Sequence, residues 1–370
     1  METEAAILWG QDEDWSVETI ELDGPKEGEV LIEYVASGMC HSDEHLRTGD
    51  FPCTYPMIAG HEGAGIILDV GSGVTRVKPG DHVVTGFVPA CGHCPSCARG
   101  HSNLCDNGAA LLSGTQIDGT SRHHIRGQDL SVMCCLGTFA RHGVVNEMSC
   151  VKVGDDIPLD VACLVGCGVT TGWGSSVYAA DIQPGDKVAV IGIGGIGAAA
   201  LQGARLAGAD MIFAIDPVEL KRELAPRFGA THTFSSVEDA TESIRELTWG
   251  RMCDKVVCAM GVGRGDLIAS IMAIVAKRGR CVVTNIHPST ENAITVNMMD
   301  LIVMQKQIVG AIFGSANMNY DIPHLLQLYR LGHLDLDGMV TKRYELKDIN
   351  DGYQDLRDGK NIRGVLVYKD

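Results

Sequence analysis

Long apolar segments are missing from this sequence. The glycine-rich uncharged run at residues 188–204 has 17 residues, whereas a helix that crosses a bilayer needs about 20 apolar residues. The amino-terminal segment carries neither a basic leader nor an apolar core, so no secretory signal is visible. We therefore expect a cytoplasmic protein without a transmembrane helix.

Positive charge is also scarce. The 370 residues include 30 Lys and Arg against 47 Asp and Glu, which gives a formal net charge of -17. Such a surface repels nucleic-acid backbones and anionic membranes. The composition therefore argues against both as main partners and favours a small uncharged or cationic ligand.

Cysteine, in contrast, is plentiful, with 14 residues in the chain. In a small secreted domain this number indicates disulfides, but in a reducing compartment it indicates metal ligands or small apolar core residues. The chain is too long for one core, because single cores rarely grow beyond about 250 residues. We expect two domains.

The hydrophobic pattern changes along the chain. Residues 1–150 are rich in Val, Ile and Thr with frequent turn signals, which predicts a mainly β region. From about residue 155, apolar strands alternate with helices, which predicts a doubly wound parallel sheet. The strands are expected at 186–194, 211–216, 231–234, 253–261 and 280–286, and the helices at 195–209, 217–230 and 265–279. The final segment, residues 350–370, returns to the first region in this interpretation.

One loop concentrates four cysteines in fifteen positions: Cys91, Cys94, Cys97 and Cys105. This spacing can wrap four thiolates around a tetrahedral Zn²⁺ at about 2.3 Å each. An iron–sulfur cluster, a disulfide pair and unconnected core cysteines are the alternatives. A four-thiolate zinc site has no open coordination position, so we expect a structural brace and look elsewhere for the chemistry.

Three further stretches each offer one metal ligand beside glycines. Cys40, His61 and Cys167 would supply two thiolates and one imidazole, a set typical of catalytic zinc that leaves a fourth position for water or an alcohol oxygen. Glu62 can ligate transiently or tune such a site. Each residue alone is weak support, because isolated cysteines and histidines are more often buried or hydrogen-bonded structural residues.

A glycine motif follows the strand expected at 186–194. The G-x-G-x-x-G pattern consists of Gly192, Gly194 and Gly197 and includes the adjoining Gly195 and Ile196. Such glycines allow a tight turn and close approach of the backbone to a pyrophosphate at a helix N-terminus. A glycine-rich turn without a ligand is the alternative interpretation.

An acidic residue ends the next strand, at Asp216. It lies 24 residues after Gly192 (216 minus 192), where a carboxylate can bind the adenosine ribose hydroxyls and repel a 2′-phosphate. NAD is therefore favoured over NADP, although Lys221 and Arg222 nearby keep NADP open.

Together these segments resemble the zinc-dependent medium-chain alcohol dehydrogenases over nearly the whole chain. The likeness is greatest to the actinobacterial nicotinoprotein branch, whose members retain NAD tightly and use an artificial nitroso electron acceptor. It rests on "GMCHSDEH", "GHEGAG", the cysteine loop, "CLVGCGVTTGWGSSV", "GIGGIG", "IVGAIFGSAN" and "DGYQDLRDGKNIRGVLVY". The resemblance implies a GroES-like mainly-β catalytic domain, residues 1–155 and 318–370, and a Rossmann NAD-binding domain, residues 156–317.

The resemblance also assigns roles to individual residues. It implies one catalytic zinc on Cys40, His61 and Cys167 with Glu62 beside it, and one structural zinc on the cysteine loop. In addition, Ser42 would touch the substrate oxygen and His45 would end the proton relay at the surface. The cofactor residues it implies are His41, in place of an arginine of liver-type relatives, Thr171 at the nicotinamide, Asp216 and Lys221 at the adenosine ribose, and Arg363 at the pyrophosphate.

The expected activity is reversible oxidation of a primary alcohol to an aldehyde with NAD, which is recycled by a second substrate or an electron acceptor if it stays bound. Thiol-dependent formaldehyde oxidation with mycothiol or glutathione is one alternative, and a non-catalytic zinc- and nucleotide-binding protein is another. The "IVGAIFGSAN" segment indicates a homodimer first and a tetramer second. Residues 111–139 contain the candidates for the substrate pocket, where His123, His124 and Arg126 are expected on a solvated face.

Overall fold

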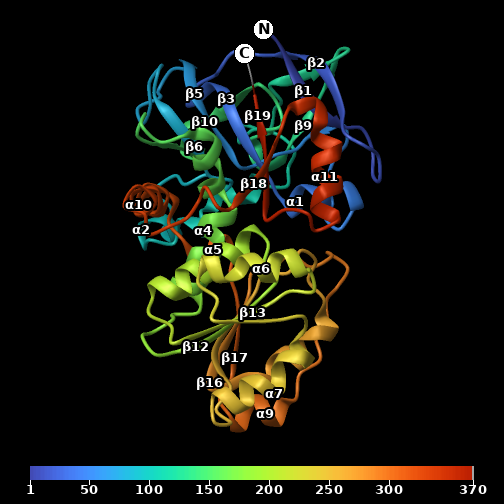
Figure 1. Cartoon of the computed structure of the whole chain (residues 1–370). Coiled ribbons are helices and arrows are strands. Elements are labelled where there is room, and N and C mark those ends of the chain that lie inside the picture. The colour runs from blue at the N-terminus through green and yellow to red at the C-terminus, as the bar shows by residue number, and fades with distance from the viewer. Residues whose placement is uncertain (369–370) are drawn as a thin grey trace. The chain divides into compact units, whose positions relative to one another are not determined.

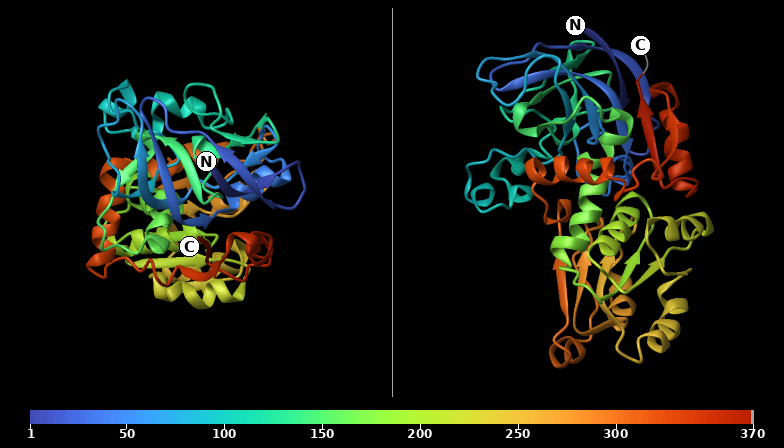
Figure 2. Two further views of the ribbon diagram at one scale, coloured as in Figure 1. Left: turned by 90° about the horizontal axis from the view of Figure 1, so that it is seen from above. Right: turned by 60° about the vertical axis from the view of Figure 1, so that its left-hand side comes forward.

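The first strand and the last strand of the chain belong to the same structural unit. The computed structural model describes residues 1–368, which form two units. Unit 1 contains Met1–Cys167, Asn317–Asp358 and the segment from Arg363, and unit 2 contains Gly168–Ala316 and Gly359–Ile362. The first and last strands of the chain both lie in unit 1 (Figure 2).

Unit 1 is built on two sheets (Figure 1). One has the order β8-β7-β2-β1-β4-β9 and comprises β1 (Glu2–Leu8), β2 (Ser16–Leu22), β4 (Met57–Ile58), β7 (His123–Ile125), β8 (Gln128–Asp129) and β9 (Ser131–Val132). The other has the order β11-β6-β5-β3-β19-β18, with β10 paired to β3, and comprises β3 (Glu29–Met39), β5 (Gly63–Val70), β6 (His82–Thr85), β10 (His142–Asn146), β11 (Cys150–Lys152), β18 (Val340–Tyr344) and β19 (Arg363–Val367).

Five helices complete unit 1: α1 (His41–Thr48), α2 (Pro95–Ala98), α3 (Leu159–Ala162), α10 (Met318–Arg330) and α11 (Ile349–Arg357). An aromatic cluster in the core joins segments that are distant in the sequence. The ring of Trp15 lies 5.7 Å from Phe139 and 5.6 Å from Tyr353 of α11. Each such pair contributes about 0.5–1.5 kcal/mol beyond its buried area. These contacts hold the carboxyl-terminal helix in the same core as the amino-terminal strands.

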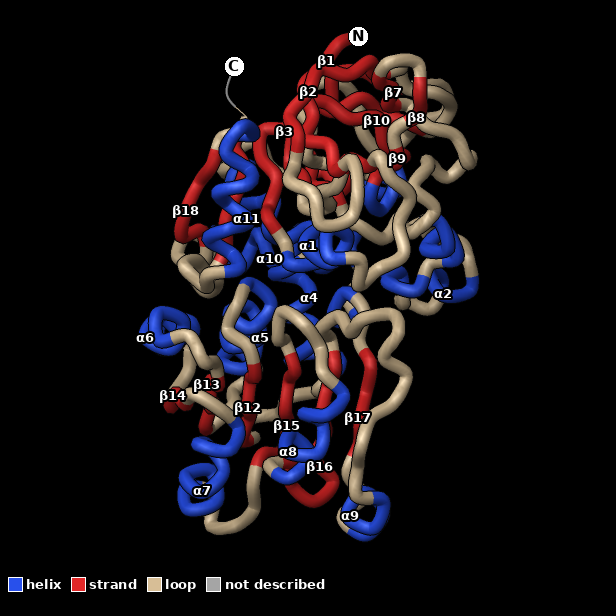
Figure 3. The backbone as a smooth tube through the Cα atoms, turned by 90° about the vertical axis from the view of Figure 1, so that its right-hand side faces the viewer, coloured by secondary structure: helices blue, strands red, loops and turns tan. Residues whose placement is uncertain are grey.

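Unit 2 contains a six-stranded parallel sheet with the order β14-β13-β12-β15-β16-β17 (Figure 3). Its strands are β12 (Lys187–Ile191), β13 (Met211–Ile215), β14 (His232–Phe234), β15 (Cys253–Cys258), β16 (Val275–Val283) and β17 (Gln307–Gly310). In chain order this is 3-2-1-4-5-6, the arrangement of dinucleotide-binding sheets. The fold class predicted from the sequence, a mainly-β region plus a doubly wound parallel sheet, is confirmed.

The helices of unit 2 are α4 (Gly168–Gly174), α5 (Gly195–Leu206), α6 (Glu219–Phe228), α7 (Val237–Leu247), α8 (Ile268–Ala273) and α9 (Met298–Val303). Helix α5 packs against β12, β13 and β15. The helix expected at 265–279 ends at Ala273, because the residues from Val275 onward pair with β15 as strand β16. Within residues 1–368, no helix is long and apolar enough to span a membrane.

Candidate functional site

The four cysteines of the loop form one compact cluster in unit 1. The Sγ atoms of Cys91 and Cys97 are 4.0 Å apart, as are those of Cys94 and Cys105. All four sulfurs lie within 4.8 Å of one another. A tetrahedral zinc with bonds of about 2.3 Å would place its sulfurs roughly 3.8 Å apart. The cluster therefore fits Zn²⁺ closely.

The backbone of the loop turns its N–H groups toward these sulfurs. The N–H of Cys94 donates to Sγ of Cys91 at 3.3 Å, and the N–H of Cys91 donates to Sγ of Cys105 at 3.4 Å. Backbone N–H groups of Cys97 and Asp106 lower the pKa of Cys94 to about 6. These hydrogen bonds favour the thiolate of Cys94, the form that binds a metal, whereas burial raises the pKa values of Cys97 and Cys105.

The cluster has four sulfur ligands and is coordinatively closed. Within residues 1–368 all fourteen cysteines are free thiols, so no disulfide competes for them. The side chain of Arg76 fastens the start of the loop, because its two terminal nitrogens donate to the carbonyls of Ala90 and Cys91 at 2.9 and 3.0 Å. A metal here would brace the loop, since it would have no position for a substrate.

A second cluster contains the three ligands that are scattered in the sequence. Ligand atoms of Cys40, His61, Glu62 and Cys167 lie within 4.8 Å of one another, and all four residues are buried. Cys40 stands between β3 and α1, His61 and Glu62 precede β5, and Cys167 follows a 3₁₀ turn, Cys163–Gly166. The fold of unit 1 thus brings together the predicted two-thiolate, one-imidazole set.

One buried carboxylate organises this second cluster. Asp43 in α1 accepts hydrogen bonds from the N–H groups of Cys40 at 3.2 Å and Gly60 at 2.9 Å. Its Oδ1 also lies 3.2 Å from Nδ1 of His61, which leaves Nε2 of that ring as the metal-facing nitrogen. Burial lowers the pKa of His61, but Asp43 and Cys40 more than offset this and raise the pKa well above its usual value.

The thiol of Cys40 is poised to ionise. Interaction with the Cys167 thiol lowers its pKa, burial opposes this, and His61 lowers it further, so that the pKa lies well below the usual value for cysteine. A metal ligand must be a thiolate. The hydroxyl oxygen of Ser42 lies 3.4 Å from this sulfur. The predicted proton acceptor is therefore adjacent to the predicted metal ligands.

Glu62 and Arg363 form a buried ion pair beside the cluster. The guanidinium of Arg363, at the start of β19, donates to Oε2 of Glu62, and the two residues are 5% and 0% exposed. A Cβ at Gly38 would lie 2.0 Å from that carboxylate oxygen, so glycine is needed there to make room for it. The sequence alone gave no reason to connect Gly38 with the site.

The relay histidine lies deeper than expected. His45 is only 1% exposed, so the surface position expected for it is wrong. Its Nδ1 lies 2.8 Å from Oδ2 of Asp50, a residue that the sequence motifs did not single out. His41, on the same helix, is half-buried and places its ring 5.1 Å from the ring of His45.

In unit 2, the glycine motif forms the turn between β12 and α5. Gly192 has φ of 88°, a conformation that favours glycine, and a Cβ there would lie 2.7 Å from the backbone of Met260. Gly194 is the N-cap of α5, and because it has no side chain, no cap hydrogen bond occupies the end of the helix. A Cβ on Gly194 would meet nothing within 4 Å, so the space in front of the helix is open. Helix α5 begins with Gly195, Ile196 and Gly197, whose N–H groups belong to its first turn. A helix N-terminus next to an open space is the kind of site that binds a pyrophosphate.

The acidic residue of the dinucleotide motif lies beside that turn. Asp216 follows β13, is 4% exposed, and accepts hydrogen bonds from the N–H groups of Ile193 at 2.6 Å and Val218 at 2.9 Å. The guanidinium of Arg222 donates to the carbonyl oxygens of Asp216 and Pro217. Among the other expected cofactor residues of this unit, Thr171 lies in α4 and is 5% exposed, and Lys221 is half-buried in α6.

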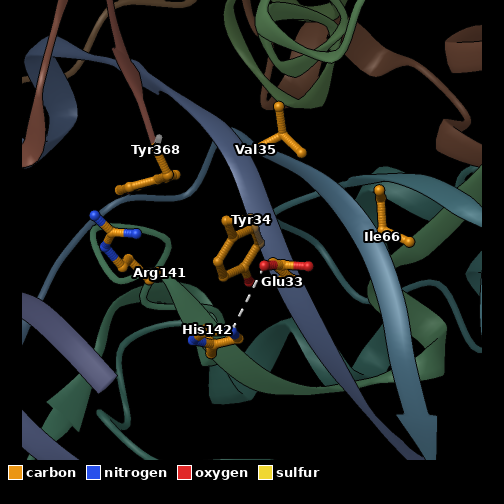
Figure 4. Close-up of a pocket in the computed structure, with 7 residues that line it drawn as sticks. All are labelled: Glu33, Tyr34, Val35, Ile66, Arg141, His142 and Tyr368. Atoms are coloured by element: carbon orange, nitrogen blue, oxygen red, sulfur yellow. Dashed lines mark ion pairs between the residues drawn. The ribbon is translucent and has the colours of Figure 1, made fainter. Parts of the chain in front are cut away.

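A separate pocket of unit 1 has a volume of 510 Å³ (Figure 4). Its charged residues are paired: Nε2 of His142 lies 4.0 Å from Glu33, and Nε of Arg141 donates to Glu4 at 2.9 Å. No member of either cysteine-containing cluster lines it. The lining residues are Glu33, Tyr34, Val35, Ile66, Arg141, His142 and Tyr368.

Comparison with protein families matches both halves of the chain. Residues 26–155 match the model described as "Alcohol dehydrogenase GroES-like domain". Residues 195–330 match the model described as "Zinc-binding dehydrogenase".

Known proteins are similar over the full length. "Alcohol dehydrogenase B" of Mycobacterium tuberculosis is 51% identical over 372 residues, with 100% of this chain and 99% of the relative covered. "NDMA-dependent alcohol dehydrogenase" of Amycolatopsis methanolica is 49% identical over 368 residues, with the same coverage. The crystal structure of benzyl alcohol dehydrogenase from Acinetobacter calcoaceticus has a TM-score of 0.93 at 28% identity and covers 100% of both chains.

Proposed function

Since the chain belongs to the zinc-dependent alcohol dehydrogenase family and is an oxidoreductase, we propose that it oxidises a primary alcohol reversibly to an aldehyde at the cluster of Cys40, His61 and Cys167. The observation that carries this proposal is the convergence of these ligands, with Glu62, within 4.8 Å. In this assignment residues 1–155 and 318–370 form the catalytic domain, and residues 156–317 form the NAD-binding domain.

The two clusters have different proposed roles. Zinc on Cys40, His61 and Cys167 would supply Lewis-acid polarisation of the alcohol, and NAD would supply the hydride acceptor. The loop of four cysteines would hold the structural zinc, because its ligand set is complete without substrate.

The protein's own groups would bind and move the proton. The Ser42 hydroxyl, 3.4 Å from the Cys40 sulfur, is placed to accept the proton of an alcohol bound at the cluster. His45, three residues further along α1, is the next basic group and would receive that proton. Asp43 would keep the His61 ring oriented by accepting from its Nδ1–H.

NAD fits the residues on the proposed cofactor path. Gly192 allows the tight turn and Gly194 leaves room at the start of α5, while Asp216 presents a negative group at the end of β13 that disfavours a 2′-phosphate. In unit 1, Nε of Arg363 is a buried donor without a hydrogen-bond partner among residues 1–368, which supports the cofactor role that the family resemblance implies for this residue.

We also propose that NAD stays bound during turnover, because the sequence resembles the nicotinoprotein branch and is 49% identical to a relative named for its dependence on NDMA. The hydride would then leave through a second substrate or an electron acceptor. The test is to add a primary alcohol to extensively dialysed enzyme without coenzyme and to record the absorbance of reduced nicotinamide. A stoichiometric signal supports retained NAD, whereas a signal only after NAD is added shows a dissociable cofactor.

The alcohol substrate can be narrowed by comparing chemical classes. Benzyl alcohol is the first probe, because a solved relative carries its name. Aliphatic and terpenoid alcohols are the comparison, and formaldehyde with and without mycothiol or glutathione tests the thiol-dependent alternative. Oxidation of an alcohol without added thiol supports our proposal, and activity only with formaldehyde plus thiol would replace it.

We further propose a homodimer formed through unit 2. Strand β17 is at the edge of the sheet, and the neighbouring helix α9 exposes Met298, Met299, Ile302 and Val303, each at least 56% exposed. Exposed apolar clusters of this kind are typical of interfaces. Light scattering on the unaltered protein and on an Ile302→Glu variant tests the proposal. We expect the molar mass to fall from that of a dimer to that of a monomer. If the variant has the same mass as the unaltered protein, the interface does not include α9. The proposed location is the cytoplasm.

A further inference from the structure

The side chain of Asp50 contacts His45, the last residue of the proposed proton relay. Oδ2 of Asp50 lies 2.8 Å from Nδ1 of the histidine, and the two side chains are 25% and 1% exposed. We propose that Asp50 is a positioning residue that holds the His45 ring with its proton on Nδ1, so that Nε2 is the nitrogen that takes the relay proton. This inference rests on the proposed function, in which an alcohol proton reaches His45.

The chain after α1 is shaped to bring this carboxylate back to the histidine. Gly49 caps α1 with φ of 78°, in the left-handed region that favours glycine. The chain then reverses, and the N–H of Phe51 donates to the carbonyl of His45 at 3.3 Å. The hydroxyl of Thr48 donates to Oδ2 of Asp50 at 2.8 Å. The imidazole is thus fixed from one side by a turn of defined geometry.

The packing of the ring adds to this constraint. The Phe51 ring meets the imidazole edge-on, with centroids 5.9 Å apart, and the His41 ring lies 5.1 Å away on the same helix. Asp50 from the turn and His41 from the helix are the titratable groups that face the imidazole in these contacts. The His45 ring therefore has little freedom to rotate away from Asp50.

The carboxylate determines which ring nitrogen acts as the base. The hydrogen bond from His45 lowers the pKa of Asp50, so its side chain is ionised at neutral pH and accepts a hydrogen bond. Nδ1 must then carry a proton, and Nε2 is the nitrogen that takes the relay proton. The same geometry holds the imidazole in catalytic triads.

The proton balance of this step is simple. Nε2 gains one proton from the relay, and the imidazolium that forms is stabilised by the Asp50 carboxylate. Nδ1 keeps its proton in the hydrogen bond to Asp50, and the imidazolium gives the proton on Nε2 up to water or a buffer base, which restores the starting tautomer. No electron moves in this step, and the imidazole returns to its neutral form.

Replacing Asp50 with asparagine tests the proposal, because Asp50→Asn keeps the shape and removes the charge. We expect kcat for alcohol oxidation to fall on the order of tenfold. This is less than the factor of about 10²–10⁴ that a positioned acid–base group contributes, because His45 itself is still present. KM should stay unchanged and the solvent deuterium isotope effect on kcat should rise. Added imidazole buffer should restore part of the rate, because the side chain at position 50 is 25% exposed and a small base can approach the relay from this side.

A double-mutant cycle separates a role through His45 from a structural role. If Asp50 acts through the imidazole, Asp50→Asn should change kcat by less than about twofold in a His45→Gln background, because the two effects then do not add. Thr48→Val is the matched control: it removes a hydrogen bond to the same carboxylate but keeps the contact with His45, and we expect kcat to stay within about twofold.

Three outcomes overturn the inference. The first is an unchanged kcat in Asp50→Asn, and the second is that Asp50→Asn lowers kcat by the same factor in the His45→Gln variant as in the unaltered enzyme. The third is a loss of kcat without a higher solvent isotope effect and without rescue by buffer. Failure of the proposed function looks different. In that case the unaltered enzyme and Thr48→Val would both fail to reduce nicotinamide with any alcohol.

Discussion

The two cysteine-containing clusters of unit 1 are built in opposite ways. The closed cluster takes four ligands from one stretch, residues 91–105, whereas the open cluster gathers its ligands from positions between Cys40 and Cys167. The closed cluster is partly accessible at Cys91 and Cys97, but all ligands of the open cluster are buried. The four ligands of the closed cluster thus come from one local loop, whereas the ligands of the open cluster meet only through the fold of unit 1.

Their surroundings differ as well. Backbone N–H groups surround the sulfurs of the closed cluster. Charged side chains, namely Asp43, Glu62 and Arg363, surround the open cluster. Backbone dipoles stabilise thiolates without introducing a net charge, whereas ionised side chains tune the ligands and the proton chemistry. This contrast supports the proposed roles, a structural zinc site in the first cluster and a catalytic zinc site in the second.

The largest effect should follow loss of a ligand from the open cluster. Cys167→Ala should lower kcat by about 10³-fold or more, because the polarising metal is worth several kcal/mol to the transition state. Steady-state kinetics measures this. Cys163→Ala is the matched control, a buried cysteine at the start of the preceding turn; it should keep most of the activity, and an equal loss in both variants would contradict the assignment.

The next effect should appear in stability rather than in catalysis. Cys94→Ser would open the loop of residues 91–105, and a crosslink around a loop of 15 residues contributes about 3 kcal/mol in the chain-entropy model. Chemical denaturation should show this loss. Activity per folded molecule should change far less than in Cys167→Ala, and a loss of catalysis without a loss of stability would reverse the roles of the clusters.

A smaller effect should follow from loosening the open cluster without removing a ligand. Asp43→Asn weakens the acceptor of the His61 Nδ1–H, and changes of this kind typically cost about 10–100-fold in metal affinity. The rate of zinc transfer to a chromogenic chelator should rise for one zinc per chain. An increased rate for both zincs would mean that the two clusters are not independent.

The smallest effect should be on the stability of the fold at low pH. Acid is also the simplest way to remove metal from both clusters, so this background effect needs to be known. His123 is 0% exposed, neither ring nitrogen has a hydrogen-bond partner among residues 1–368, and burial lowers its pKa to about 4. In the unfolded chain this histidine has its usual pKa of about 6.5 and binds a proton more readily than in the folded protein. The free energy of unfolding therefore falls as the pH drops from about 6.5 toward 4.

Replacing this histidine should remove that acid sensitivity. For His123→Leu we expect about 1 kcal/mol less loss of stability than in the unaltered protein between about pH 6.5 and 5.5. Urea denaturation at the two pH values measures the difference. Metal loss at low pH in this variant would then reflect the two clusters alone. If stability has the same pH dependence in both proteins, protonation of His123 does not contribute to the loss of stability.

Local patterns in the sequence identified much of the fold. The glycine motif, Asp216 and the alternation of strands and helices predicted the parallel sheet, because each depends on neighbouring residues. Helix α7 is not among the predicted elements, although Ser236 caps it by accepting from the N–H of Asp239. Residues 275–279 of the expected helix are part of strand β16, because strand pairing overrides local propensity.

The site was predictable only in part, for the same reason. The loop of four cysteines was evident from its spacing, but the meeting of Cys40, His61 and Cys167 came from a family resemblance. Asp43 and Asp50 were missed, because their partners are defined by three-dimensional packing. His123 was expected on a solvated face and is buried, since it pairs with the buried Leu22 in neighbouring strands of the sheet.

The central claim is that the open cluster holds its own metal ion, independent of the closed one. Zinc content per folded chain tests this most directly, measured by mass spectrometry on the purified protein, Cys40→Ala and Cys97→Ala. We predict two zinc ions in the unaltered chain and one in each variant. One zinc in the unaltered chain, or two retained in Cys40→Ala, would contradict the account.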